Sequence, residues 1–198
     1  CLEEDSYLTK KLFQIEFQVS RNNEAIITMI YHKKPPEEWQ DGLMLLSSKL
    51  NSSIILRSKR YKDIIGKDFV LETYTSGQIQ FDLYLFEQCF SQPNPFICDQ
   101  MLSWVAMNFK SSKDILELYC GVGTFTVPLS YLCKRLLATE NNRKSLKGLT
   151  SNLLLNKIEN VITARLSGQE TLDAINGLRD FRRLSHLDLK TLDIDTVF

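Results

Sequence analysis

The chain has 198 residues, of which 43% are hydrophobic and 24% are charged, an ordinary composition for a globular protein of one or two domains. Its 24 basic and 24 acidic residues cancel, so a nucleic-acid partner would have to meet a local basic patch. No run of 18 apolar residues occurs, and no membrane-spanning helix is expected. The five cysteines include no Cys-x-x-Cys pair and there are two histidines, so we expect no metal site and a cytoplasmic location.

The first half of the sequence predicts an α+β domain. Alternating apolar and polar residues predict strands over residues 12–19, 25–32, 53–57, 69–74 and 79–85. The first two form a predicted hairpin with its turn at Asn22-Asn23. A helix is expected to begin at Pro36, which suits a first helical position. Its inward face is predicted to carry Trp39, Leu43, Leu46 and Leu50.

The second half predicts an α/β domain. The breaker cluster Ser91-Gln-Pro-Asn-Pro95 places a domain boundary between residues 1–90 and 91–198. A helix follows, with a predicted inward face of Ile97, Met101, Trp104, Val105 and Phe109. Strands over 115–119, 135–139 and 160–165 then alternate with helices over 125–133, 142–157 and 168–176. This alternation predicts a parallel sheet with right-handed crossovers.

Two of these strands end in features typical of a nucleotide site. The strand over 115–119 runs into the turn Cys120-Gly-Val-Gly123, and the strand over 135–139 ends at Glu140. Ligands bind at the carboxyl ends of strands in an open α/β sheet. Gly121 and Gly123 would let the backbone pass close to a cofactor, and Glu140 is placed to meet ribose hydroxyls. The alternative is a tight turn followed by a surface acid.

The turn also lacks what other nucleotides need. A pyrophosphate fingerprint would have a third glycine where Thr126 stands, and no Gly-Lys-Ser/Thr triplet exists for a phosphate-binding loop. The pattern therefore favours S-adenosylmethionine over NAD or ATP.

Several stretches together resemble the bacterial tRNA (uracil-5-)-methyltransferase family. They are Lys11-Leu-Phe-Gln-Ile with Tyr31-His-Lys-Lys34, Ser91-Gln-Pro-Asn94, and Leu116-Glu-Leu-Tyr-Cys-Gly121 with Ala138-Thr-Glu140. The tail, 181–190 and 195–198, resembles the segment before the family's Asp-Pro-Pro-Arg motif. The resemblance implies a Rossmann-like S-adenosylmethionine methyltransferase sheet preceded by an α+β RNA-recognition domain. It also implies methyl transfer to C5 of the T-loop uridine of tRNA, giving 5-methyluridine.

The resemblance implies roles for particular residues. Gln92, Tyr119 and Glu140 match cofactor contacts, and Thr124 stands where the family has Asn, with a hydroxyl that reaches less far. Phe13 and His32 match rings that stack on the T loop. From the residues alone, other roles stay open. Gln92 could cap the helix after it, Tyr119 could be a core residue, and Phe13 and His32 could be ordinary cross-strand neighbours.

A basic run lies between the third and fourth predicted strands. Arg57, Lys59, Arg60 and Lys62 surround Tyr61, a composition that suits phosphate contacts with base stacking. A solvated loop is the alternative for this run.

No catalytic residue is predicted within the chain. C5 of uracil becomes nucleophilic only after a thiolate adds to C6, and a base must then remove the C5 proton. The family's Cys lies in a Ser-Cys-Asn-Pro run that this sequence lacks, so the Cys and the Glu base are expected beyond the chain end. With no start Met and a strand beginning at 195–198, we expect an internal fragment. Cys120 lies in the cofactor turn without a neighbouring cation to activate it, and a packing role is expected.

Competing functions remain open at this point. The same reaction could act on a ribosomal or tRNA-like RNA, or the fold could serve a small-molecule or protein methyltransferase. A non-catalytic RNA-binding fragment is a further alternative. The preferred interpretation is a monomeric enzyme that acts on the T arm of tRNA.

Overall fold

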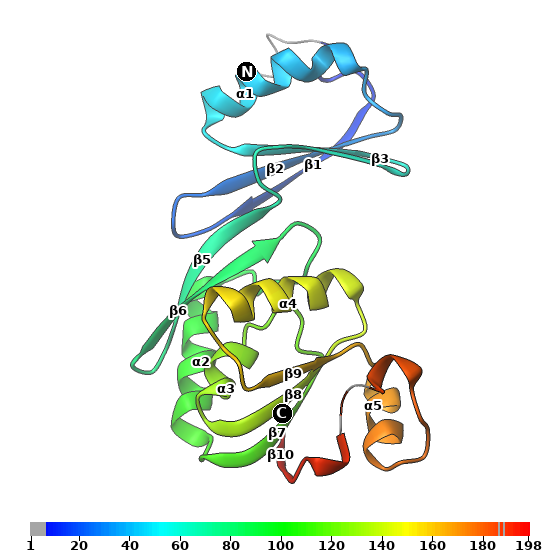
Figure 1. The fold of residues 1–198 in the computed structure, drawn as a ribbon. Helices are drawn as coiled ribbons and strands as arrows, with labels where there is room; N and C mark the ends of the chain where they lie inside the picture. Colours follow the sequence, from blue (N-terminus) through cyan, green and yellow to red (C-terminus); the bar gives the residue numbers. More distant parts are fainter. Residues whose placement is uncertain (1–6, 186, 188) are drawn as a thin grey trace. The chain divides into compact units, whose positions relative to one another are not determined.

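The computed structural model describes residues 7–185, 187 and 189–198 (Figure 1). The chain divides into two compact units, Cys1–Glu72 and Thr73–Phe198. The division falls inside β5 (Phe69–Ser76), earlier in the chain than the boundary expected at Ser91.

The first unit is built on a four-stranded mixed sheet in the order β1-β2-β3-β4. Its elements are β1 (Leu12–Val19), β2 (Ala25–Tyr31), the 3-10 turn η1 (Glu37–Trp39), α1 (Gln40–Leu50), β3 (Ser53–Ser58) and β4 (Tyr61–Ile65). β1 and β4 pair antiparallel with their neighbours, whereas β2 and β3 are parallel and α1 crosses between them. The predicted hairpin and third strand are confirmed.

The core of the first unit lies between this sheet and α1. It contains Leu8, Met29, Tyr31, Leu43, Leu46, Ile54 and Leu56. Two details differ from the sequence prediction. The α-helix begins at Gln40 after a 3-10 turn, and Leu50 at its end is 39% exposed because Asn51 in a left-handed conformation already terminates the helix there. Part of the predicted basic loop is strand β4, whose Tyr-Lys-Asp-Ile-Ile sequence alternates too weakly to stand out.

β5 and β6 (Ile79–Phe86), which correspond to the strands predicted over 69–74 and 79–85, form a two-stranded sheet. Asparagine side chains of α4 (Arg143–Leu155) and its C-terminal end hold β6 in the second unit. Asn152 bonds the backbone N and O of Tyr84 at 2.8 and 3.1 Å, and Asn156 donates to the carbonyl of Asp82 at 2.8 Å. These bonds explain why residues 73–90 associate with the α/β unit rather than with the first unit.

The second unit contains the parallel sheet predicted from the sequence, in the order β10-β7-β8-β9. Besides β6 and α4, its elements are α2 (Pro95–Asn108), β7 (Ser112–Leu118), α3 (Thr126–Ser130), β8 (Cys133–Thr139), β9 (Val161–Ala164), α5 (Gly168–Ile175), the 3-10 turns η2 (Arg182–Leu184) and η3 (Leu189–Thr191), and β10 (Ile194–Val197).

Both faces of this sheet are covered, as Figure 1 shows for α4 and α5. One face packs on α2, α3 and α4 through Val105, Leu129, Leu149 and Leu153. The other packs on α5 through Ala174 and Ile175, and on the residues flanking α5 through Leu166, Phe181 and Leu184. The result is an α/β fold in which the carboxyl ends of β7, β8 and β9 lie along one edge.

The inward face of α2 differs from the prediction. Cys98, Leu102 and Val105 are its buried residues, whereas Ile97, Met101 and Trp104 are 49%, 40% and 60% exposed. Apolar residues lie on most sides of this helix, so periodicity alone could not select the buried face. The part of the chain that the structure describes contains no helix long and apolar enough to cross a membrane. It also contains no cluster of three or more potential metal ligands among His, Cys, Asp and Glu.

Candidate functional site

The turn after β7 adopts backbone conformations that favour glycine. Gly121 and Gly123 have φ angles of 59° and 100°. A Cβ on Gly123 would lie 2.6 Å from Cδ1 of Leu149 in α4, which would have to shift, so the protein's own packing as well as the positive φ favours glycine there. A Cβ on Gly121 would meet none of the described atoms within 4 Å. The space beside Gly121 is open, which fits the approach of a cofactor.

The carboxylate of Glu140 ties this turn to the end of β8. Its Oε2 accepts a 3.1 Å hydrogen bond from the backbone N of Gly121, and its Oε1 accepts a 2.7 Å bond from that of Asn142. A carboxylate can accept about four hydrogen bonds, so both oxygens retain acceptor capacity. The structure brings the turn and Glu140 together, and the contact with a ribose stays a prediction.

Tyr119 extends the site toward β9. Its side chain is 73% exposed, which excludes the core role left open by the sequence. A Cβ on Gly168 would lie 2.5 Å from the Tyr119 hydroxyl, so the ring reaches the first residue of α5. The preceding residue, Ser167, lines a cavity with Asn141, Arg165 and Glu170. The phenol, this cavity and the glycine turn lie along the same edge of the sheet.

Gln92 and Thr124 are less closely tied to the turn. Thr124 follows Gly123 directly and is half-buried. Asn94, not Gln92, caps α2, because its Oδ1 accepts from the backbone N of Phe96 and Ile97 at 3.0 and 3.1 Å. The capping alternative for Gln92 is therefore wrong. Among the described residues, no hydrogen bond joins Gln92 to the glycine turn, and its cofactor role stays a prediction.

A second carboxylate near the turn was not singled out from the sequence. Glu117 lies in β7 and is 2% exposed. Burial raises the pKa of Glu117 to about 8, and the hydroxyl of Thr126 offsets part of the rise. An acid inside the apolar run 115–118 was the available signal, because an acidic side chain is rarely buried without a specific reason.

Cys120 lies in the turn but is poorly suited to be a nucleophile. Burial raises the pKa of its thiol far above the usual range, and the carboxylates of Glu117 and Glu140 raise it further. A thiol that stays protonated does not attack carbon. This environment supports the packing role expected for Cys120.

In the first unit, Phe13 and His32 lie side by side, as the sequence predicted for hairpin neighbours. Their ring centroids are 5.0 Å apart with the planes at 59°. The register between β1 and β2 shifts around Phe13, since Leu12 pairs with Tyr31 but Gln14 pairs with Ile30. Such a bulge turns a side chain away from the regular alternation. The side chain of Phe13 is 63% exposed, so the pair presents aromatic surface to solvent.

The basic residues of the predicted RNA site lie at the same end of the sheet. Arg57 pairs with Ile30 of β2 and with Lys62 of β4. Lys59 and Arg60 are exposed in the turn that follows, beyond the end of β2 where His32 lies. The register thus brings the predicted RNA residues Phe13, His32, Arg57, Lys59 and Arg60 to one end of the sheet. RNA binding by them stays a prediction.

One family's sequence pattern matches the chain throughout. The family described as tRNA (uracil-5-)-methyltransferase matches residues 1–198. The chain belongs to the tRNA (uracil-5-)-methyltransferase family. The resemblance seen in the sequence motifs is therefore confirmed for the whole chain.

Relatives of this methyltransferase-family chain carry the name tRNA/tmRNA (uracil-C(5))-methyltransferase. The protein from Saccharophagus degradans is 42% identical over 192 residues, which are 96% of this chain and 53% of that protein. The protein from Acinetobacter baumannii (strain ACICU) is 40% identical over 200 residues, covering 100% of this chain and 55% of that protein. The chain spans about half the length of these relatives.

A solved structure shares the fold. The Pyrococcus abyssi tRNA (uracil-54, C5)-methyltransferase, crystallised with S-adenosyl-L-homocysteine, is 16% identical with a TM-score of 0.59. The match covers 76% of this chain and 38% of that structure. It supports the α/β methyltransferase-like sheet at the level of the fold.

Proposed function

We propose that this chain binds S-adenosylmethionine and the T arm of tRNA for methylation of the T-loop uridine at C5, which gives 5-methyluridine. Membership of the family supports the reaction class. The observation that carries the cofactor assignment is the hydrogen bond between Glu140 and the backbone N of Gly121. It joins an acid and a glycine turn at the carboxyl ends of two adjacent parallel strands, where α/β folds bind nucleosides.

The residues at this edge fit the proposed cofactor. Glu140 would accept from the ribose hydroxyls, and the open space beside Gly121 would let the cofactor approach the backbone. Tyr119 would pack against the bound nucleoside, with Thr124 and Gln92 as further polar contacts. When bound, S-adenosylmethionine supplies a methyl group activated by a sulfonium.

The uracil side of the reaction sets the RNA requirement. The target base must leave its stack before a protein can act on C5. Phe13 and His32 would stack on bases of the opened T loop, and Arg57, Lys59 and Arg60 would bind phosphates. The thiolate that adds to C6 and the base that takes the C5 proton are not assigned to residues of this chain.

Other aspects of the proposal rest on family membership alone. They are the RNA-recognition role of residues 1–90, the methyltransferase role of residues 91–198, a monomeric state and a cytoplasmic location. The relatives' name includes tmRNA beside tRNA. Methylation of a tRNA-like RNA is therefore the favoured second candidate.

Calorimetric titration of the chain with S-adenosylmethionine tests the cofactor assignment. Glu140→Ala should weaken binding at least tenfold, because hydrogen bonds to a charged group contribute about 1.5–3 kcal/mol each. Glu159→Ala, a change at an exposed acid, is the matched control. Equal affinities for the wild type and Glu140→Ala, at equal melting temperatures, would refute the assignment. Titration with the T-arm hairpin of tRNA, the corresponding hairpin of tmRNA, a ribosomal RNA hairpin and a hairpin of unrelated loop would separate the RNA candidates.

A further inference from the structure

A cavity of about 310 Å³ in the first unit is lined by residues such as Lys11, Lys33 and Trp39, and the proposed function leaves it unused. It is formed by two segments, the turn that precedes β1 and the connection from β2 to α1. A 3.1 Å hydrogen bond from the backbone N of His32 to the carbonyl of Lys11 joins these segments. Lys11 and Lys33 line the cavity, and Lys33 follows His32 directly in the chain. The cavity therefore lies next in the chain to the predicted stacking pair, although neither ring lines it.

The inner wall of the cavity is aromatic and firmly held. The ring of Trp39 packs edge-on against Tyr7 at 5.8 Å and against Tyr31 at 5.6 Å. The hydroxyl of Tyr31 donates to the carbonyl of Leu8 at 2.8 Å, which fixes the buried ring. Tyr7 is 39% exposed and Trp39 is partly exposed. The wall therefore offers aromatic surface that is already ordered.

The rim of the cavity carries an excess of positive charge. Lys10, Lys11, Lys33 and Lys34 all line it. Of these four lysines, Lys34 alone forms an ion pair with an acid among the described residues, with Glu37 at 3.3 Å. The ammonium of Lys34 also lies 5.1 Å from the ring centroid of Tyr61. Several ammonium groups around one opening repel one another, so folding alone does not account for them.

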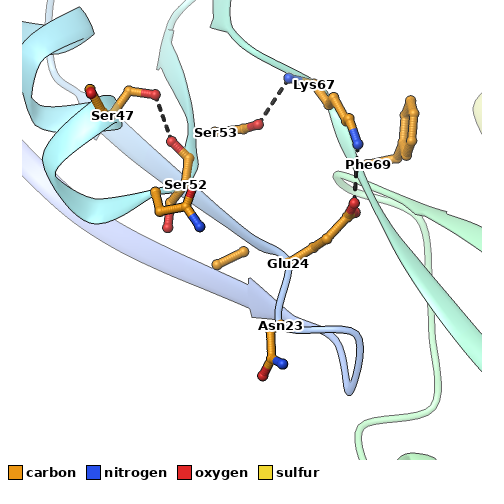
Figure 2. Close-up of a pocket in the computed structure, with 10 residues that line it drawn as sticks. Asn23, Glu24, Ser47, Ser52, Ser53, Lys67 and Phe69 are labelled. Atoms are coloured by element: carbon orange, nitrogen blue, oxygen red, sulfur yellow. Dashed lines mark hydrogen bonds and ion pairs between the residues drawn. The ribbon is translucent and has the colours of Figure 1, made fainter.

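The larger cavity at the other end of the same sheet provides a contrast. It measures about 410 Å³ and is lined by serines together with Glu24, Lys67 and Phe69. Figure 2 shows the ammonium of Lys67 at the carboxylate of Glu24, a 3.0 Å ion pair. Its charge is neutralised within the cavity. An unbalanced positive rim thus distinguishes the smaller cavity from its larger neighbour.

We propose that the lysine-rimmed cavity is a second RNA subsite, which takes a backbone phosphate at Lys11 and Lys33 and a nucleoside against Tyr7 and Trp39. The proposal rests on the RNA role proposed for Phe13 and His32. Lys33 follows His32, and the backbone of Lys11 accepts a hydrogen bond from that of His32, so these lysines are the candidates for the phosphates next to a base stacked on the pair. Positive grooves that alternate with aromatic rings are the usual way to bind single-stranded RNA.

Tryptophan fluorescence can report occupancy of this subsite. The chain has two tryptophans, Trp39 and Trp104, so Trp104→Phe leaves Trp39 as the single reporter. In this background, titration with T-arm RNA should change the Trp39 emission with the same midpoint as filter binding of labelled RNA. Inorganic phosphate and uridine monophosphate at the same concentrations should leave the emission unchanged. An equal response to these small anions would identify a small-anion site and overturn the RNA subsite.

Charge-removing variants test the lysines. The double variant Lys11→Gln/Lys33→Gln should bind T-arm RNA about tenfold more weakly, or weaker still. The slope of log affinity against log salt concentration should also fall by about 1 for each phosphate contact that is lost. Lys67→Gln, which removes an equal charge from the neutral cavity, should leave both quantities unchanged. Melting curves for each variant exclude loss of folding.

The outcomes separate this proposal from the proposed function. If Phe13→Ala weakens RNA binding while the lysine variants and Trp39 emission do not respond, the RNA role stands and the second subsite is wrong. If the wild-type chain binds no T-arm RNA at low salt, both the RNA role and the subsite are refuted.

Discussion

The side-chain amide of Asn152 donates a 2.9 Å hydrogen bond to the carbonyl oxygen of Val122, the residue between the two glycines of the glycine turn. The same side chain bonds both backbone groups of Tyr84 in β6. Asn152 is fully buried, so these bonds form away from water. One side chain therefore fixes the turn to α4 and to β6, and the shape of the turn depends on it.

We expect Asn152→Asp to weaken cofactor binding in addition to lowering the stability of the fold. A carboxylate cannot donate to the carbonyls of Val122 and Tyr84, and a buried acceptor left without its donor costs about 1–3 kcal/mol. S-adenosylmethionine binding should weaken about tenfold in calorimetry. Asn156→Asp is the matched control, because Asn156 anchors β6 through Asp82 without contacting the turn. Equal losses of affinity in the two variants, at equal stability, would show that Asn152 has no special effect on the turn.

A second prediction concerns Phe13. Phe13→Ala should weaken binding of T-arm RNA by about 1–3 kcal/mol, the usual contribution of a base stacked on an aromatic ring. Its affinity for S-adenosylmethionine should not change. Phe17→Ala is a matched control, since Phe17 lies on the same strand and is 70% exposed. A fall in melting temperature with unchanged RNA affinity would mean that Phe13 contributes only to packing.

Local sequence patterns predicted the glycine turn but not the hydrogen bonds of Asn152 that hold the turn in place. Strand alternation and a Gly-x-Gly turn are local patterns, so the ends of β7 and β8 and the place of Glu140 could be predicted. The bond between Asn152 and Val122 joins residues 30 apart, and the bonds to Tyr84 span 68 residues. No local pattern encodes such contacts.

The same limit explains the errors in the helices and strands. The buried face of α2 depends on which side meets the sheet, and exposed Ile97 and Trp104 are as apolar as buried Leu102. β4 was missed because its strand character comes from pairing with β3 rather than from its own alternation. The boundary between the two units falls before β6 because β6 packs along α4. The breaker cluster Ser91-Gln-Pro-Asn-Pro95 lies after β6 and gives no sign of this packing.

A third prediction follows from Glu117. Its carboxyl has a pKa of about 8 when folded, against 4.5 for the ordinary group, so between these values the folded state keeps a proton that the unfolded state has lost. The contribution of this group to stability is therefore complete below about pH 4.5 and falls as the pH rises to about 8. Glu117→Gln, which is neutral at every pH, should remove this decline.

Urea unfolding at pH 5, 7 and 9 would measure the effect. Each pKa unit corresponds to about 1.4 kcal/mol, so the free energy of unfolding of Glu117→Gln relative to the wild type should rise by a few kcal/mol over this range. Glu159→Gln, at an exposed position, should follow the wild type. Parallel curves for Glu117→Gln and the wild type would show that Glu117 ionises normally in the folded protein.

The last prediction is that Cys120 does not act as the nucleophile for uracil. Cys120 is 7% exposed, and burial, with the acids Glu117 and Glu140 nearby, raises the pKa of its thiol, so it stays protonated at neutral pH. Iodoacetamide at pH 7.5 should leave Cys120 unmodified in the folded chain and alkylate it after unfolding in urea, as measured by peptide mass spectrometry. T-arm RNA with 5-fluorouridine at the target position has no C5 proton to lose, so any thiolate adduct at C6 would persist on a denaturing gel. We expect no adduct with this chain. An adduct that disappears in Cys120→Ala, or rapid alkylation of Cys120 in the folded chain, would make Cys120 the nucleophile instead.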